Sequence, residues 1–202
     1  MSMNNFEPKT SNQKPRTVGI LAFHGDFSEH KVVLGNLGIT SIEVRTVDAL
    51  AGVQKLIIPG GESTVIAKFL HETKLDRAII KRVRRRTLSI FGTCAGAIIL
   101  AKKITGKNAP KSLALIDVTL DRNAYGSQLQ SFEASIDVKD VAKSVDVAFI
   151  RAPIITGVGR RANVLAKHGK NPVIVRQKNI LIATCHPEVR GETRLHEYFL
   201  KM

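Results

Sequence analysis

The chain has 202 residues, 44% of them hydrophobic and 24% charged, and its formal net charge is +14. This length suits a single well-cored domain, and the composition excludes general disorder. No apolar run reaches the roughly 18 residues that span a bilayer, and the polar start lacks the apolar core of a secretory signal. Because Cys94 and Cys185 are the only cysteines, no disulfide framework is expected. We therefore expect a cytoplasmic protein without a membrane segment.

Residues 1–16 are predicted to form a flexible extension, because they are polar and carry no hydrophobic period. A single domain is expected over residues 17–202. In its first half, β-rich apolar runs alternate with helical segments, which predicts parallel strands joined by crossover helices. The expected strands are 17–23, 41–47, 54–61 and 88–91, and the expected helices lie within 24–38, over 63–86 and over 97–104.

The second half has the pattern of strands and hairpins joined by short turns. The expected strand regions are 113–121, 129–138, 145–153 and 164–185. Together the two halves predict an α/β fold with three layers. Its centre is a flavodoxin-like, mostly parallel sheet with helices on both faces, to which a smaller antiparallel part is added.

Three strand ends carry residues of unusual chemistry. In an open α/β sheet, ligands bind beyond the carboxyl ends of the strands, so the residues that follow each apolar run are the first to consider. These residues are Gly60-Gly61-Glu62-Ser63 after the third strand, Gly92-Thr93-Cys94-Ala95-Gly96 after the fourth, and His186-Pro187-Glu188 after the last.

Cys94 is placed where a strand gives way to a helix, a sharp turn that suits a nucleophile. A thiol needs a base and a nearby positive charge, and His186 is the expected proton acceptor. Glu188 lies two residues further on, so in an extended segment it would point to the same side and orient the imidazole. The backbone N–H groups of Gly61 and Ala95 are candidate donors to an oxyanion.

Each of these features also has a structural interpretation. A cysteine beside an apolar strand is usually a small buried hydrophobe, and we assign that role to Cys185. A single histidine is more often structural than catalytic, and Gly-Gly is most often a turn. The histidines expected to be structural are His30, His71, His168 and His196. The coincidence of three such features at three strand ends favours a catalytic site.

At this level the sequence resembles the class I (triad-type) glutamine amidotransferases, and within them the glutaminase subunits of pyridoxal 5′-phosphate synthase (the PdxT/SNO family). The resemblance extends from Val18 to about Leu200. It is carried by PGGEST (59–64), FGTCAG (91–96), RNAYGSQLQSFE (122–133), FIRAP (149–153) and HPE (186–188), in the family's order. The FGTCAG elbow alone would indicate only the superfamily, whereas RNAYGSQ together with FIRAP indicates the vitamin B6 branch.

The resemblance implies a triad of Cys94, His186 and Glu188 that releases ammonia from L-glutamine through a glutamyl thioester, without metal or cofactor. Ammonia would pass to a barrel-shaped synthase subunit in a hetero-oligomer. The implied glutamine contacts are Gly61, Glu62, Ser63, Arg122, Ile150 and Arg151. Glu62 would pair with the substrate ammonium, and Arg122 would bind the α-carboxylate or brace the pocket.

Two positions depart from the family pattern. His24 occupies the place after the first strand where the family usually has glutamine, which puts the coupling between partner docking and oxyanion-site formation in question. Cys185 replaces an aromatic residue before HPE, a change expected to alter only packing.

The densest basic run is KRVRRR, residues 81–86. It fits a solvated helix end, a docking surface for an acidic partner, or, as the least favoured interpretation because aromatic residues are few, a nucleic-acid site. Two other functions also stay open, namely a glutaminase that serves another synthase and a non-catalytic binding module on the same fold.

Overall fold

The computed structural model describes residues 17–122 and 131–202 of the chain. Its helices are α1 (Phe27–Asn36), α2 (Val47–Ala51), α3 (Ser63–Glu72), α4 (Leu75–Arg84), α5 (Ala95–Leu100) and α6 (Arg194–Leu200), with a short 3-10 turn, η1, over Glu188–Arg190. Its strands are β1 (Thr17–Leu21), β2 (Thr40–Val44), β3 (Lys55–Ile58), β4 (Ser89–Thr93), β5 (Ala101–Thr105), β6 (Ile116–Asp121), β7 (Phe132–Val138), β8 (Ala142–Phe149), β9 (Ile154–Val158), β10 (Asn163–His168), β11 (Asn171–Gln177) and β12 (Ile180–Ala183).

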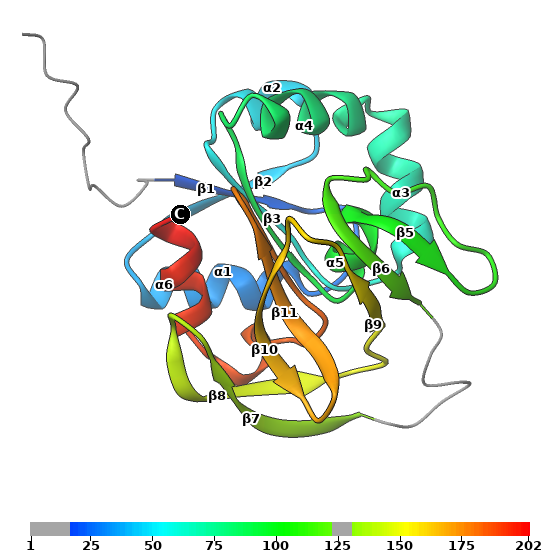
Figure 1. The fold of residues 1–202 in the computed structure, drawn as a ribbon. Helices are drawn as coiled ribbons and strands as arrows, with labels where there is room; N and C mark the ends of the chain where they lie inside the picture. Colours follow the sequence, from blue (N-terminus) through cyan, green and yellow to red (C-terminus); the bar gives the residue numbers. More distant parts are fainter. Residues whose placement is uncertain (1–16, 123–130) are drawn as a thin grey trace, which may run out of the picture.

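A seven-stranded sheet in the order β10-β11-β12-β4-β3-β1-β2 forms the centre of the molecule (Figure 1). Its five strands β2, β1, β3, β4 and β12 are mutually parallel, whereas β11 and β10 continue the sheet in antiparallel fashion. Numbered by their sequence among these five, the parallel strands run 2-1-3-4-5, which is the flavodoxin-like order. The predicted fold class is therefore confirmed.

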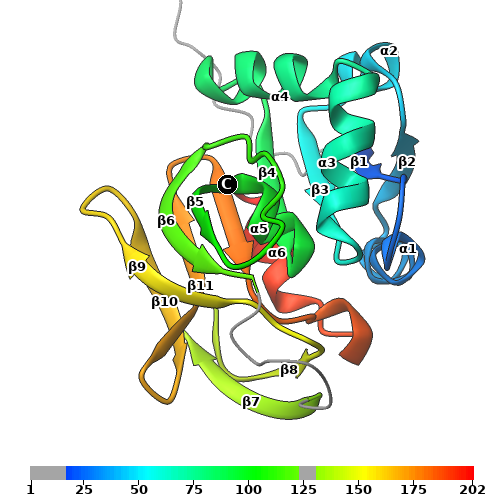
Figure 2. The same ribbon diagram turned by 90° about the vertical axis from the view of Figure 1, so that its right-hand side faces the viewer.

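Alternation along the buried strands divides the core between the two faces of this sheet. On β3, for example, Leu56 and Ile58 join one apolar cluster and Ile57 joins the other. The first cluster includes residues of α2 to α5 and the small sheet β5-β6-β9, and the second includes residues of α1, α6 and the hairpin β7-β8. In both views α4 lies at one end of the molecule and the hairpin at the other (Figure 2). The fold thus has the three layers that the sequence predicts.

The helix expected over 63–86 is in fact two helices. α3 ends at Glu72, and Lys74 takes a left-handed conformation with φ 61° before α4 begins. The break lets α3 bury Ile66 and Leu70 while α4, in a new direction, buries Leu75 and Ile79. Because both helices keep the same apolar period, the sequence pattern does not reveal the reorientation between them.

Two further boundaries differ from the prediction. The helix expected over 97–104 spans Ala95–Leu100, and Ala101–Thr105 forms β5, which pairs with β6. β2 ends at Val44, and α2 follows with its N-terminus capped by the side chain of Thr46. Pairing with a neighbouring strand and a cap are tertiary and local signals that apolar periodicity does not carry.

Among the helices within residues 17–122 and 131–202, none is both long and apolar enough to cross a membrane. The extension predicted over residues 1–16 lies outside the described residues.

Candidate active site

The three motif segments meet at one edge of the central sheet. Gly60 and Gly61 follow β3, Cys94 follows β4 and His186 follows β12, and these three strands are adjacent and parallel. Asp26 lies in the loop after β1, the strand on the other side of β3. The strand order reverses between β1 and β3, and such a reversal is where ligands bind in this class of sheet.

Cys94 stands on a strained turn between β4 and α5, with φ 45° and ψ −101°. The residue is 8% exposed, and its Sγ lies 3.9 Å from the Ile150 carbonyl oxygen. Gly96 lets α5 pack closely against the end of β3, because a Cβ at that position would stand 2.0 Å from the carbonyl oxygen of Ile58. The positive φ of Cys94 places the thiol at a sharp turn between strand and helix, the position that the sequence predicts for a nucleophile.

His186 is held by backbone hydrogen bonds to strand β8. Its N–H donates to the Ala148 carbonyl at 2.7 Å, and its own carbonyl accepts from Ala148 at 3.1 Å, so a bridge ties it to β8. Its Nδ1 lies 2.8 Å from Oε1 of Glu188, and both side chains are buried. The segment is not extended as expected, because Pro187 is helical and Glu188 begins η1. The short turn, rather than strand alternation, brings the carboxylate to the imidazole.

The pKa of His186 is raised to about 11. Burial by itself lowers it, but the hydrogen bonds to Cys94 and Glu188 and the charges of these two partners outweigh burial. Burial raises the pKa of Glu188, and the hydrogen bond and charge of His186 oppose that change. A proton on His186 is therefore favoured when both partners are anionic, which is the state that proton transfer from the thiol creates.

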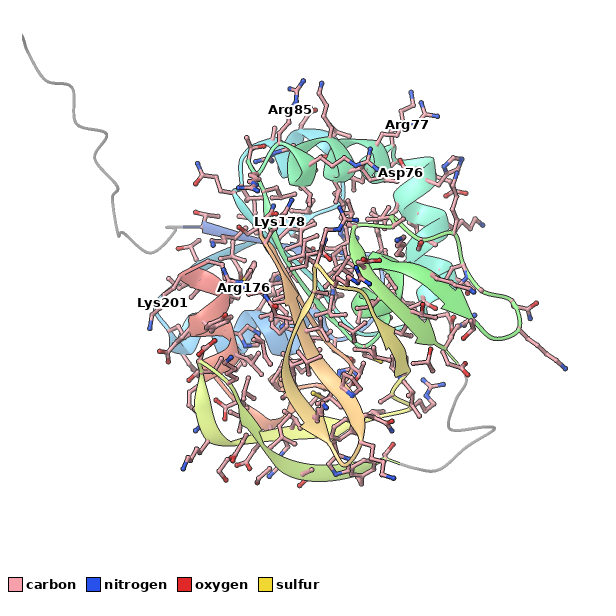
Figure 3. All side chains as sticks on the ribbon, in the orientation of Figure 1. Asp76, Arg77, Arg85, Arg176, Lys178 and Lys201 are labelled. Atoms are coloured by element: carbon pink, nitrogen blue, oxygen red, sulfur yellow. The ribbon has the colours of Figure 1, made fainter. Side chains whose placement is uncertain are left out.

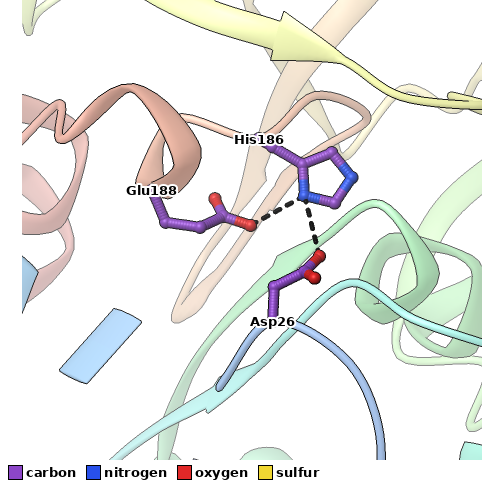
Figure 4. Close-up of side chains that lie close together, drawn as sticks. All are labelled: Asp26, His186 and Glu188. Carbon is purple, nitrogen blue, oxygen red and sulfur yellow. Dashed lines mark hydrogen bonds and ion pairs between the residues drawn. The ribbon is translucent and has the colours of Figure 1, made fainter. Parts of the chain in front are cut away.

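Asp26 is a site residue that the sequence reasoning missed. Its Oδ2 lies 3.4 Å from the same Nδ1 of His186 that Glu188 contacts (Figure 4). The sequence feature that could have revealed Asp26 is its position just after the first strand, at the sheet edge where the motifs meet. The donor atoms of Asp26, His186 and Glu188 lie within 4.8 Å of one another, a spacing that would also suit a metal ion. However, a metal would need the Nδ1 lone pair, and the hydrogen bond to Glu188 uses the proton of that nitrogen.

The candidate oxyanion donors, Gly61 and Ala95, lie at the ends of the neighbouring strands β3 and β4. Gly61 has φ +137°, and a Cβ there would stand 3.0 Å from both Cα of Gly25 and Nδ1 of His24. The backbone N–H of Glu62 donates to that Nδ1 at 3.2 Å. The loop after β1 is thus packed directly on the loop that carries Gly61.

Three of the residues implied as glutamine contacts, Glu62, Arg122 and Arg151, form a charged cluster. Oε1 of Glu62 accepts hydrogen bonds from Arg122 and from the hydroxyl of Thr64, the latter at 3.0 Å. Burial raises the pKa of Glu62, but the hydrogen bonds of Thr64 and the charges of Arg122 and Arg151 lower it overall. These two arginines therefore face the same carboxylate.

Ser63 and Ile150 complete the predicted set of contacts. Ser63 is buried, and its Oγ has no hydrogen-bond partner among the described residues. The carbonyl of Ile150 faces Cys94, as described above. The rest of the RNAYGSQ motif, residues 123–128, lies outside the described residues, so the structure places only Arg122 of that segment.

A cavity of about 590 Å³ is lined by residues of α3 and α4 and by the segment 108–113. Its lining includes Thr64 and Asn108, which hold Glu62 and Arg122 respectively through hydrogen bonds. Cys94 is not part of this lining, so the cavity adjoins the charged cluster and is separate from the thiol.

The chain is similar to known glutamine amidotransferases over almost its whole length, and residues 20–202 match the SNO glutamine amidotransferase family. It is 46% identical over 185 residues to the pyridoxal 5′-phosphate synthase subunit PdxT of Thermus thermophilus, covering 92% of this chain and 96% of that protein. The PdxT of Thermosipho africanus is 42% identical over 186 residues, covering 92% and 97%.

Solved structures agree with these relatives. A structure described as "Crystal structure of glutamine amidotransferase" has a TM-score of 0.87 and 45% identity, covering 91% of this chain and 97% of that one. PurLQS from Thermotoga maritima, at 20% identity and a TM-score of 0.65, covers 93% and 98% and shares the fold. On the family match and on these identities, the chain belongs to the SNO glutamine amidotransferase family.

Proposed function

We propose that Cys94, His186 and Glu188 hydrolyse the side-chain amide of L-glutamine and that the ammonia passes to a partner synthase subunit. The chain is a glutaminase subunit of pyridoxal 5′-phosphate synthase. The observation that carries the proposal for its chemistry is the position of one buried imidazole, which is hydrogen-bonded to the carboxylate of Glu188 at 2.8 Å and close enough to Cys94 for the thiol to raise its pKa.

The proposed reaction begins when His186 takes the proton of Cys94 and Sγ attacks the amide carbon of glutamine. The backbone N–H groups of Gly61 and Ala95 would stabilise the resulting oxyanion. His186 then returns its proton to the leaving nitrogen, so ammonia departs and a glutamyl thioester remains on Sγ. A water molecule, deprotonated by His186, attacks the thioester and releases glutamate. Glu188 keeps the imidazole oriented and compensates its charge in both halves.

The glutamine pocket is proposed to include Gly61, Glu62, Ser63, Arg122, Ile150 and Arg151. Arg122 already donates to Glu62 and to the carbonyl of Asn108, at 2.9 Å for the second bond. This double engagement supports a bracing role for Arg122 over direct binding of the substrate carboxylate. The free Oγ of buried Ser63 supports a substrate contact, because a buried hydroxyl without a partner is costly.

The partner is proposed to be the synthase subunit of pyridoxal 5′-phosphate synthase, in a hetero-oligomer, because the relatives at 42–46% identity are named as subunits of that enzyme. A cytoplasmic location is proposed as well. Both cysteines are free thiols, which fits a reducing compartment.

The test is release of ammonia and glutamate by the purified chain, with and without the synthase subunit, with Cys94→Ser as the control. Release that the subunit stimulates and that Cys94→Ser abolishes is the expected result. Release at the same rate with and without the subunit would favour a glutaminase that serves another synthase. No release under either condition would favour the non-catalytic module.

A further inference from the structure

Glu188 is followed by a chain of buried polar side chains, Thr93, His30 and His196, which we call the histidine line. His196 on α6 and His30 on α1 are both fully buried, and Nε2 of His196 lies 2.8 Å from Nδ1 of His30. Nε2 of His30 lies 3.2 Å from Oγ1 of Thr93 and 3.5 Å from Oε1 of Glu188. The Thr93 hydroxyl reaches the same Oε1 at 3.3 Å. The oxygen that meets His186 is therefore also the end point of this line.

One direction of the hydrogen bonds satisfies the carboxylate. If Nε2–H of His196 donates to His30, then Nε2–H of His30 can donate to Thr93 and points toward Glu188, and the Thr93 hydroxyl donates to Glu188. In the reverse direction, the Nε2 lone pair of His30 would face the carboxylate. Nδ1 of His196 has no hydrogen-bond partner among the described residues, so no bond fixes the ring proton on that nitrogen.

Both histidines are suited to act as neutral donors. Burial lowers the pKa of His30 well below its usual value, and the charges of His196 and His186 lower it further. Burial lowers the pKa of His196 to about 4, with the Glu192 backbone opposing the change. Neutral imidazoles offer one N–H each, so at neutral pH the line can carry one donor per ring toward Glu188.

We propose that His30 and His196 are positioning residues that keep Glu188 ionised and its Oε1 directed at His186. The inference rests on the proposed triad. The side chain of Glu188 is completely buried, its Oε2 has no hydrogen-bond partner among the described residues, and burial favours the protonated acid. Asp26 adds a like charge nearby, which also favours protonation. The hydrogen bond and charge of His186 oppose these effects, and so does the hydroxyl of Thr93, which donates to Oε1. His30 orients that hydroxyl through its contact with Oγ1, and its own Nε2 lies 3.5 Å from Oε1.

The matched variants are His30→Leu, which removes the donor, and His30→Gln, whose amide can donate from about the position of Nε2. In His30→Leu we expect kcat for glutamine hydrolysis, measured with the synthase subunit, to fall roughly 10- to 100-fold. KM should change little. The acid limb of kcat/KM should move up by about 1 pH unit, because the carboxylate then takes a proton more readily. His30→Gln should return the acid limb of kcat/KM to its position in the unaltered chain.

Phe91→Leu is the control for packing, since the ring of Phe91 lies 5.4 Å from that of His196 and 6.3 Å from that of His30, and it offers no donor. It should lower stability without moving the acid limb. An acid limb in His30→Leu that coincides with that of the unaltered chain would overturn the inference, as would an equal shift in Phe91→Leu.

A second measurement needs neither turnover nor a folded leucine variant. Imidazole nitrogen shifts of the 15N-labelled full chain at pH 7.5 report the tautomer of each histidine, with His30→Gln and His196→Gln used for assignment. Both rings should carry their proton on Nε2. A proton on Nδ1 of His30 would overturn the proposal. Because no catalysis is involved, this result judges the inference separately from the Cys94→Ser assay, which judges the proposed function.

Discussion

The backbone N–H of Glu62 donates a hydrogen bond of 3.2 Å to Nδ1 of His24, so the loop after β1 holds the loop after β3. Nδ1 accepts this bond only while it carries no proton, which places the ring proton on Nε2 in the neutral form. The position of His24 beside Gly61 makes it part of the wall of the proposed oxyanion site. The departure from the family's glutamine thus replaces one possible acceptor by another.

The first prediction follows from this contact. His24→Gln should preserve or raise glutaminase activity in the presence of the synthase subunit, because a side-chain amide oxygen can accept the same N–H. His24→Leu, which has no acceptor, should lower it. Rates of ammonia release by the two variants provide the test, and a large loss in His24→Gln would show that the imidazole has a role of its own.

The second prediction concerns the two thiols. Cys94 is 8% exposed at the turn after β4, whereas Cys185 is completely buried and burial raises its pKa. Iodoacetamide should therefore modify Cys94 first and give a single adduct in the native chain. Peptide mass spectrometry after brief labelling identifies the position, and prior incubation with a glutamine analogue that alkylates thiols should block it. Equal labelling of Cys185 would contradict the assigned burial.

The site residues at the strand ends could be predicted from the sequence because the features that mark them are local. Cys94 between two glycines, His186 beside Pro187, and the apolar runs before them are visible within a few residues. The strand order then follows from short right-handed connections in an α/β chain. The structure indeed brings Cys94, His186 and Glu188 together, although a 3-10 turn and not an extended segment joins the last two.

What the sequence did not reveal depends on contacts between distant segments. His30 and His196 are 166 positions apart, and nothing in either neighbourhood indicates that their rings meet. Asp26 looks like an ordinary loop residue until β1 and β12 are both in place. Similarly, Ala101–Thr105 continues the apolar pattern of α5 and becomes a strand only because β6 is available for pairing. Tertiary pairing overrides local preference in each case.

The third prediction uses two glycines. A Cβ on Gly60 would stand 2.3 Å from Cε1 of His186 and 2.7 Å from Oδ2 of Asp26, so Gly60→Ala must displace the imidazole. We expect kcat to fall roughly 100-fold, as for other small misplacements of a catalytic group. Gly35→Ala is the matched control. It lies in α1 with nothing within 4 Å of the added Cβ, and it should leave kcat unchanged while stabilising the fold by about 0.5–1 kcal/mol.

The fourth prediction separates the cations of the basic run. The guanidinium of Arg82 donates to the carbonyls of Leu50, Val53 and Thr87, the last two at 2.6 and 3.0 Å. Arg85, by contrast, is exposed and extends outward from the end of α4 (Figure 3). Arg82→Met should lower the free energy of unfolding by roughly 1–2 kcal/mol, and Arg85→Met should change it little. Urea denaturation measures both, and equal losses would contradict a structural role particular to Arg82.

The fifth prediction concerns stability in acid. The pKa of His196 is lowered to about 4 in the native chain, and that of His30 is also lowered well below its usual value. Below about pH 6.5 the unfolded chain therefore binds protons that the native chain does not, so the free energy of unfolding falls with pH by roughly 1.4 kcal/mol per unit for each histidine. The raised pKa of His186 has its effect at alkaline pH. It stabilises the native chain below pH 6.5, and this contribution is lost as pH rises from 6.5 toward the native pKa.

Urea denaturation at pH 7.5, 6.0 and 5.0 measures this dependence, and His196→Gln isolates one contribution. The variant should be less stable than the unaltered chain at pH 7.5, where it lacks the bond to His30. Between pH 7.5 and 5.0 its free energy of unfolding should fall by about 2 kcal/mol less than that of the unaltered chain, because glutamine takes up no proton on unfolding. Carboxylates that titrate below pH 5 are common to both chains and cancel in the difference. Parallel pH dependences would mean that His196 takes up a proton as readily in the native state as in the unfolded one.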